Sequence, residues 1–268
     1  MDSSSEDETV ALAKQAGAET LVIPRHTFNH GATRDMALRH LATSDVVVFL
    51  TQDAIPADHQ ALATLVQAFD NPRVGAAFGR QLPHVDATPI AAHARLFNYP
   101  PDSRLVDAGD IASLGIKAAF LSNSFAAYRR QALIDVGGFP HGTILSEDMI
   151  AGARLLNAGR ALAYQADACV YHSHNYTLLE ETKRYFDIGV LHAREAWLLA
   201  NLGNPEGEGV RFVGSEMRYL WRLSPFSMPE AALRTLLKYV GYRLGRIEHR
   251  LPLRLKRRLS MHHRYWTL

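Results

Sequence analysis

A carboxylate stands at the carboxyl end of an apolar run. Val46–Leu50 is five apolar residues, three of them β-branched, which predicts a strand buried on both faces at the centre of a sheet. Pro56 prevents that strand from continuing beyond Asp53. Ligands bind at the carboxyl ends of strands in open α/β sheets, and a carboxylate there suits a divalent cation that holds phosphate oxygens. An alternative role for Asp53 is a turn or helix N-cap before Asp58.

Two histidines follow a second apolar segment. His172 and His174 come directly after Ala168–Tyr171, which reads as a strand. Residues at i and i+2 lie on the same side if the strand continues. A lone histidine is usually structural, but His172 close to Asp53 would complete a cation site.

Adjacent carboxylates form a third candidate. Glu147 and Asp148 precede the predicted helix 150–157, and either is able to serve as a general base. Ser146 capping that helix, with both carboxylates in its first turn, explains the same residues structurally. From spacing alone the cap is the preferred interpretation.

Residues 28–35 read as a glycine-containing loop that opens a helix over 35–41. Loop amides at a helix start, with Arg34 beside them, form a plausible phosphate cradle. His30 has a simpler interpretation as a loop residue that bonds a backbone carbonyl. In the apolar run 118–128, Ser122, Asn123 and Ser124 either hydrogen-bond within the core or face a ligand.

The elements that must position these side chains alternate between strand and helix. Strands are predicted over 21–23, 46–50, 74–78, 118–128, 161–164 and 168–171, and helices over 8–16, 35–41, 58–69, 90–98, 129–136, 150–157, 178–201, 212–224 and 229–250.

Composition bounds the class of protein. The 268-residue chain is 47% hydrophobic and 21% charged, as expected of a globular protein with a sizeable core. A single cysteine, Cys169, excludes an internal disulfide and a multi-cysteine zinc site, which fits a reducing, cytoplasmic setting. No apolar run approaches the roughly 20 residues that span a bilayer, and the acidic start is no secretory signal.

Charge is unevenly distributed. Residues 229–268 contain ten Lys or Arg and only two acidic residues, although the whole chain carries a formal charge of +2. Such a basic tail predicts contact with an anionic surface. A solvated helix face that packs on the rest of the protein is an equally good interpretation.

Seven short motifs occur in one order along the chain: Asp-Ser-Ser-Ser-x-Asp-x-Thr, Phe-Asn-His-Gly-Ala-Thr-Arg, Leu-Thr-Gln-Asp-Ala-Ile-Pro, Gly-Arg-Gln-Leu-Pro, Gly-Gly-Phe, Ser-Glu-Asp and His-Ser-His-Asn-Tyr. Each motif alone is unspecific. Together they resemble family 2 glycosyltransferases, and more narrowly the bacterial rhamnosyltransferase branch. The resemblance runs from Asp2 to about His192, and the closing Ser-Met-His-His-Arg-Tyr-Trp is similar to the tail of that branch.

This resemblance implies a GT-A fold: a Rossmann-like α/β architecture with a mixed central sheet flanked by helices and a C-terminal helical extension. The expected domains are a catalytic domain over 1–177 and a helical region with a basic tail over 178–268. A divalent cation, Mn²⁺ or Mg²⁺, and inversion at the anomeric carbon are implied as well.

The resemblance also implies residue roles. Asp53 matches the last Asp of the family's Asp-x-Asp metal motif, whose first Asp is replaced here by Thr51, and His172 matches a second metal ligand, with His174 as the runner-up. Asp148 matches the catalytic base and Glu147 the residue that helps position the acceptor. Donor-binding residues are expected at Asp2, His30, Arg34, Gln52, Asp53 and Arg80, and acceptor-side residues at Asn123, Gly138 and Phe139.

The implied donor is a nucleotide-sugar, dTDP-L-rhamnose by branch resemblance alone. The implied acceptor is a saccharide or lipid-linked saccharide in O-antigen or related surface-polysaccharide synthesis. The basic C-terminus would then contact the inner face of the cell membrane, and no nucleic-acid partner is expected. Family members carry a further βαβ unit of about 30 residues before the Asp2 turn. A non-catalytic remnant or scaffold that lacks this unit is therefore the alternative.

Overall fold

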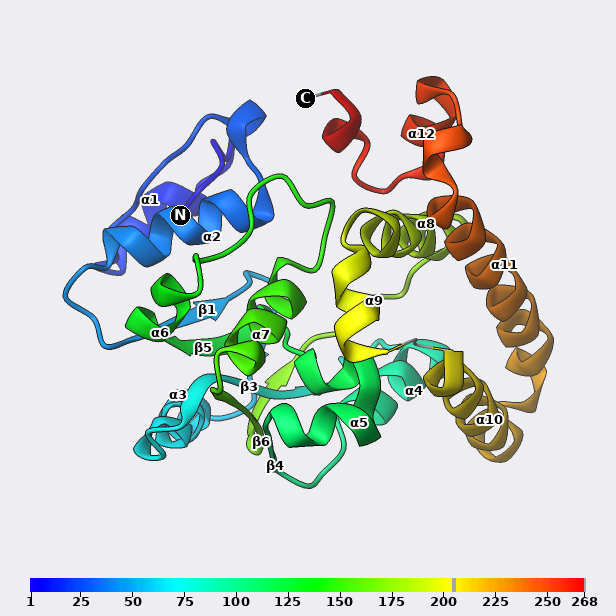
Figure 1. The fold of residues 1–268 in the computed structure, drawn as a ribbon, viewed down its shortest axis with the longest axis horizontal. Helices are drawn as coiled ribbons and strands as arrows, with labels where there is room; N and C mark the ends of the chain where they lie inside the picture. Colours follow the sequence, from blue (N-terminus) through cyan, green and yellow to red (C-terminus); the bar gives the residue numbers. More distant parts are fainter. Residues whose placement is uncertain (204–205, 268) are drawn as a thin grey trace.

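A six-stranded mixed sheet forms the centre of the computed structural model, which describes residues 1–203 and 206–267 (Figure 1). Its path is β1 (Val46–Leu50), β5 (Phe125–Arg129), β3 (Val74–Leu82), β6 (Ala161–Tyr171) and β2 (Ile55–Pro56), and β4 (Arg104–Val106) pairs with β6 off this path. The β3–β6 pair is parallel, whereas β5 runs antiparallel to both of its neighbours. This arrangement is the mixed α/β sheet that was predicted.

The position of β1 in the sheet differs from the prediction. Among the described strands β1 pairs with β5 alone, so it lies at an edge of the sheet rather than at its centre. Its burial is correspondingly partial, with Val47 buried and Leu50 49% exposed. An apolar run shows that a strand is suited to burial, but it does not show which strands lie beside it.

Two other strands also differ from their predictions. Residues 118–124 are not part of the predicted strand: a 3₁₀ helix ends at Ala119, and an irregular stretch with a turn at 123–124 leads into β5. The predicted pair 161–164 and 168–171 is one strand, β6, whose pairing with β3 shifts register between Gln165 and Cys169. Residues Leu21–Ile23 form only one bridge, between Asp2 and Val22.

Helices cover the sheet and extend beyond it (Figure 1). Those of the first part are α1 (Thr9–Gln15), α2 (His30–His40), α3 (Ala61–Val66), α4 (Pro89–Asn98), α5 (Ile111–Leu114), α6 (Arg130–Asp135) and α7 (Glu147–Asn157). The second part contains α8 (Leu178–Arg194), α9 (Ala196–Leu202), α10 (Glu206–Leu223), α11 (Met228–Arg246) and α12 (Leu253–Leu259). The predicted helix 178–201 is therefore interrupted at Glu195, and α10 begins six residues before the predicted helix 212–224.

The C-terminal helices pack against the rest of the protein. Phe186, Val190 and Leu198 belong to the same buried cluster as Tyr128 and Leu155. The chain then turns back toward the first part, so that the His262 ring lies 5.8 Å from that of His30, the first residue of α2. No described helix is both long and apolar enough to cross a membrane.

Candidate active site

A cavity of about 550 Å³ collects most of the predicted site residues. Its walls come from the turn after β1, from α4, α7 and α8, from the segment after β6 and from the C-terminal tail. Asp53, Asp148 and His172 all line it, although they are far apart in the sequence. The sheet therefore brings the two strand ends and the start of α7 to one place, as expected at the carboxyl ends of strands.

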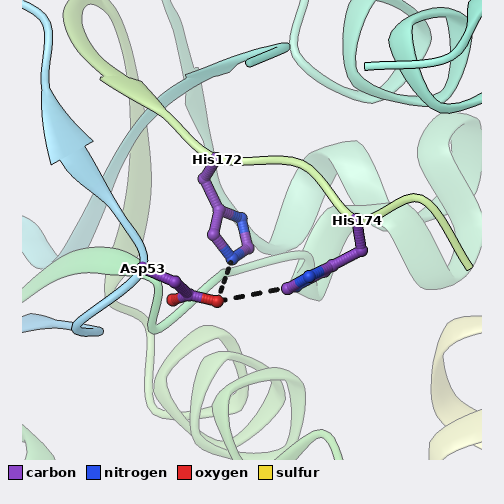
Figure 2. Close-up of side chains that lie close together, drawn as sticks. All are labelled: Asp53, His172 and His174. Carbon is purple, nitrogen blue, oxygen red and sulfur yellow. Dashed lines mark ion pairs between the residues drawn. The ribbon is translucent and has the colours of Figure 1, made fainter. Parts of the chain in front are cut away.

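Asp53, His172 and His174 form a compact ligand cluster (Figure 2). Nε2 of His172 lies 3.3 Å from Oδ2 of Asp53, and Nε2 of His174 lies 3.8 Å from the same oxygen. One ligand atom from each residue lies within 4.8 Å of the other two. Strand β6 ends at Tyr171, yet both imidazoles still point toward Asp53, so the predicted pairing of His172 with Asp53 is present.

The orientation of the His172 ring is fixed by a hydrogen bond at its second nitrogen, Nδ1, which faces away from Asp53. Its Nδ1 lies 2.9 Å from Oε1 of Gln81, and Arg95 donates to that same oxygen at 2.6 Å. An amide oxygen accepts, so Nδ1 carries the proton and Nε2 presents a lone pair toward Asp53. Gln81 is itself held, because its amide nitrogen donates to the Ser122 hydroxyl at 2.8 Å.

The ionisation states match a cation site. Burial lowers the pKa of His172 to about 4, so the imidazole is neutral at neutral pH. Partial burial opposes ionisation of Asp53, but local hydrogen bonding outweighs it and lowers the pKa of that carboxyl. A carboxylate and two neutral imidazoles are a ligand set for a divalent transition-metal ion.

Glu147 and Asp148 face the cavity from the first turn of α7. Glu147 is 5% exposed and pairs with Arg34, whose Nη1 lies 2.5 Å from Oε1. Asp148 is half-buried and accepts from the backbone amides of Asn123 at 3.1 Å and Met149 at 2.8 Å. Burial, and then the charge of Glu147, raise the pKa of Asp148 to about 7. A carboxyl with its pKa near neutrality is suited to accept a proton.

The helix-cap interpretation of this motif is wrong. Ser146 adopts the left-handed conformation with φ 57°, and its side chain makes no capping hydrogen bond. Such a conformation is costly for a residue other than glycine and clusters at functional sites. The turn therefore aims the two carboxylates at the cavity and does not serve to cap α7.

Arg34 and His30 lie on a helix, not in a loop. Asn29 caps α2 by accepting from the Ala32 amide at 3.0 Å, so the helix begins at His30. The helix therefore begins five residues before the predicted start at Asp35, because the Asn29 side chain caps it there. Arg34 follows His30 by one turn, and its Nη1 lies 3.3 Å from Nδ1 of His30, which places both side chains on the cavity wall.

Three predicted donor residues do not line this cavity. Arg80 lies within β3, which continues to Leu82, and adjacent strand residues face opposite sides, so Gln81 occupies the cavity side instead. Gln52 is exposed in the turn after β1. The carboxylate of Asp2 accepts from the amide and hydroxyl of Ser5 at 2.9 and 2.5 Å.

Of the predicted acceptor-side residues, Asn123 alone lines the cavity. It is buried, and its amide nitrogen donates to Glu147 at 3.0 Å. Phe139 is 1% exposed and packs edge-on against Phe49 in the core. A Cβ on Gly138 would lie 2.0 Å from a carboxylate oxygen of Asp35, so that glycine allows a close approach. Gly138 and Phe139 therefore stabilise the fold and do not line the cavity, and their acceptor-side role stays a prediction.

Sequence reasoning missed other lining residues: Gln81, Arg95, Arg184, Glu216 and His262. They come from β3, α4, α8, α10 and the C-terminal residues 260–267, and three of them, Arg95, Arg184 and Glu216, stand in none of the seven motifs. Two signals were available: the Gly-Arg-Gln-Leu-Pro motif contains Gln81, and the histidine-rich ending Ser-Met-His-His-Arg contains His262.

The fold and this site define a sugar-transferring enzyme of the nucleotide-sugar type, and comparison with known proteins agrees. The sequence pattern of Glycosyl transferase family 2 matches residues 1–137, and the chain belongs to that family. It is 49% identical to the O-antigen chain rhamnosyltransferase RfbN of Salmonella typhimurium, over 100% of this chain and 85% of that protein. It is 48% identical to the O-antigen chain rhamnosyltransferase WbaN of Salmonella anatum, over 100% of this chain and 85% of that protein.

Solved structures share the fold. The mannosyltransferase PcManGT of Pyrobaculum calidifontis, in complex with GDP-Man and Mn²⁺, is 18% identical with a TM-score of 0.51, covering 99% of this chain and 74% of that one. Residues 1–349 of TarS from S. aureus are 14% identical with a TM-score of 0.52, covering 93% and 80%. The GT-A-like architecture predicted from the motifs is thereby confirmed.

Proposed function

We propose that this glycosyltransferase transfers L-rhamnose from dTDP-L-rhamnose to a saccharide acceptor in O-antigen synthesis, with inversion at the anomeric carbon. The observation that carries this proposal is the 49% and 48% identity to two O-antigen chain rhamnosyltransferases across the whole chain. The arrangement of the cavity supports the chemistry, because a cation cluster and a basic carboxylate line the same space.

Asp53, His172 and His174 would hold the divalent cation. The donor set fits, since Nε2 of His172 is free of its proton and Oδ2 of Asp53 lies 3.3 Å away. Two imidazoles favour Mn²⁺ over Mg²⁺, which prefers oxygen ligands. When bound, the cation supplies positive charge that stabilises the leaving nucleoside diphosphate. Arg95 and Arg184 line the same cavity and would add to that stabilisation.

Asp148 would deprotonate the acceptor hydroxyl. Its raised pKa makes it basic enough to take a proton near neutral pH. Both of its oxygens accept backbone amides, which fixes the orientation of the carboxylate. Glu147 is held by Arg34 and Asn123, so it remains an ordered hydrogen-bond acceptor beside the base. One base and no covalent intermediate give a single displacement, and hence inversion.

A lipid-linked acceptor would place the enzyme at a membrane surface. Trp221, in the last turn of α10, and Phe226, between α10 and α11, are 71% and 97% exposed. Arg218 and Arg222 on α10 are exposed as well. Exposed aromatic residues beside arginines are typical of peripheral contact with anionic lipid. The charge replacement Arg218→Glu with Arg222→Glu should reduce co-sedimentation with phosphatidylglycerol vesicles, and unchanged co-sedimentation would contradict this contact.

The transfer reaction itself is the direct test. The chain is incubated with Mn²⁺, a rhamnose-accepting O-antigen oligosaccharide and, in separate reactions, dTDP-L-rhamnose, UDP-N-acetylglucosamine or GDP-mannose. We expect product from dTDP-L-rhamnose alone, with the anomeric configuration opposite to that of the donor by NMR. Transfer from another donor would retain the glycosyltransferase and refute rhamnose. Retained configuration would refute the single displacement.

A further inference from the structure

The C-terminal tail, defined as residues 260–267, is fixed to α8 by a buried carboxylate. Asp187 is 0% exposed, and its Oδ2 accepts the backbone amides of Met261 at 2.8 Å and His262 at 3.2 Å. A buried carboxylate is costly unless it is hydrogen-bonded, and here two consecutive tail amides provide those bonds. The backbone at His262 is therefore held in place.

A second anchor follows four residues later. Trp266 is buried beside Phe186 of the main core, with ring centroids 6.4 Å apart. Arg194 stacks on the Trp266 ring at 5.1 Å, and its Nη1 donates to the Tyr265 hydroxyl at 2.8 Å. With anchors on both sides, the short segment between them has little freedom to move away from the cavity.

His262, whose amide belongs to the first anchor, lines the active-site cavity with its side chain. Its ring lies 5.8 Å from that of His30, which in turn approaches Arg34. The imidazole makes no hydrogen bond within residues 1–203 and 206–267, so both of its nitrogens are available to a ligand. Burial lowers the pKa of His262 to about 4, so the ring is neutral and has one donor and one acceptor nitrogen.

Helix α8 links this histidine to an arginine. Arg184 lines the same cavity and precedes Asp187 by three residues, so the two side chains share one face of the helix. The face that anchors the tail thus also presents a guanidinium, a group suited to bind phosphate oxygens. His30 and Arg34, on α2, complete the wall on the other side of His262.

We propose that His262 binds the diphosphate of the nucleotide-sugar donor together with Arg184, and that Asp187 is the positioning residue that holds the tail in place. This inference rests on the proposed function, because it requires a nucleoside-diphosphate donor in the cavity. It adds the C-terminal tail to a donor site that already includes His172, His174 and Arg184 from beyond the family-matched segment 1–137.

The test is calorimetric titration of the full chain with dTDP in the presence of Mn²⁺. His262→Ala should weaken dTDP binding about 10- to 100-fold, the loss expected for a hydrogen bond to a charged group. His263→Ala is the matched control, since that neighbouring histidine is exposed and does not line the active-site cavity. His262→Gln retains a hydrogen-bond donor and should recover part of the affinity. It also serves as the second test variant if His262→Ala folds poorly.

Asp187→Asn should also weaken donor binding, because it weakens the hydrogen bonds that hold the C-terminal tail in place. In transfer assays we expect its KM for the donor to rise more than its kcat falls, and the KM for the acceptor to remain unchanged. His262→Ala and His262→Gln that bind dTDP as well as His263→Ala would overturn the inference while leaving the proposed function intact. A rise in acceptor KM alone would also overturn it. A wild-type chain that binds none of dTDP, UDP and GDP would overturn both.

Discussion

Two aspartates in one cavity have opposite environments. Asp53 follows an edge strand, is 47% exposed and faces two histidines, and its pKa lies below the ordinary value. Asp148 is half-buried in the first turn of α7 beside Glu147, and its pKa is raised. The same side chain is therefore a ready cation ligand in one place and a base in the other. Pairs of carboxyls with pKa values pushed apart mark such a division of roles.

The surroundings explain the difference. Asp53 has neutral imidazoles within 4 Å and solvent on one side, so its negative charge is tolerated. Asp148 is half-buried beside a second carboxylate, and the two backbone amides and the charge of Arg34 only partly offset these effects. Arg34 neutralises Glu147 directly, not Asp148. The comparison predicts that substitutions at the two places impair different steps.

The largest effect is expected at the base. Asp148→Asn preserves shape but removes the proton acceptor, so transfer should fall by about 10²- to 10⁴-fold. Asp135→Asn is the control: it replaces an exposed carboxylate on α6 and should leave the transfer rate unchanged. Steady-state kinetics measure the effect. A variant at position 148 with wild-type kcat would show that the base lies elsewhere.

A smaller effect on transfer is expected from Gln81, which hydrogen-bonds to the cation ligand His172. Gln81→Ala removes the acceptor that orients His172, and groups in this position typically change metal affinity by 10- to 100-fold. Mn²⁺ titration of the transfer rate gives the apparent affinity, and kcat at saturating Mn²⁺ should be nearly normal. Exposed Gln67→Ala is the control. An unchanged Mn²⁺ requirement in Gln81→Ala would refute the role of this hydrogen bond.

The pH dependence of kcat should reflect the ionisation of Asp148 and not that of Asp53. Below the pKa of Asp148, kcat should fall by about a factor of ten for each pH unit. Because transfer needs ionised Asp148, kcat should rise with pH up to its pKa of about 7 and then level off. Asp53 stays ionised over this range, since its pKa is lowered. A rate that is flat between pH 5 and pH 7 would contradict Asp148 as the base.

Folding stability should fall as pH rises, whereas kcat should rise, and this is the smallest of the expected effects. A carboxyl whose native pKa is raised stabilises the fold below its unfolded pKa, and this contribution is lost as pH rises through the native value. The wild-type melting temperature should therefore decline from pH 5 to pH 8 more than that of Asp148→Asn, which cannot ionise. Parallel melting curves for the two proteins would show that Asp148 is not held in a raised-pKa environment.

The sequence identified the parts of the site that sit in local patterns. Asp53 follows an apolar strand, and Glu147 with Asp148 precedes a helix, so short-range signals located them. The family resemblance added roles, and the sheet then brought Asp53 and His172 together as expected.

Long-range geometry was not predictable in the same way. Gln81 was missed in favour of Arg80 because the strand extends further than its apolar run, and a one-residue difference reverses the side that faces the cavity. The acceptor-side expectation for Phe139 came from the family resemblance alone, and the local sequence did not reveal that this side chain packs in the core. His262 reaches the cavity through the Asp187 anchor, a contact across 75 residues that no local pattern reveals.

The central claim is that Asp53 serves the donor and Asp148 serves the acceptor. The most direct measurement is calorimetric titration of dTDP, with and without Mn²⁺, into the wild type, Asp53→Asn and Asp148→Asn. We expect Mn²⁺ to strengthen dTDP binding in the wild type and in Asp148→Asn, and to have no effect in Asp53→Asn. Loss of the Mn²⁺ effect in Asp148→Asn, with the effect retained in Asp53→Asn, would contradict the account.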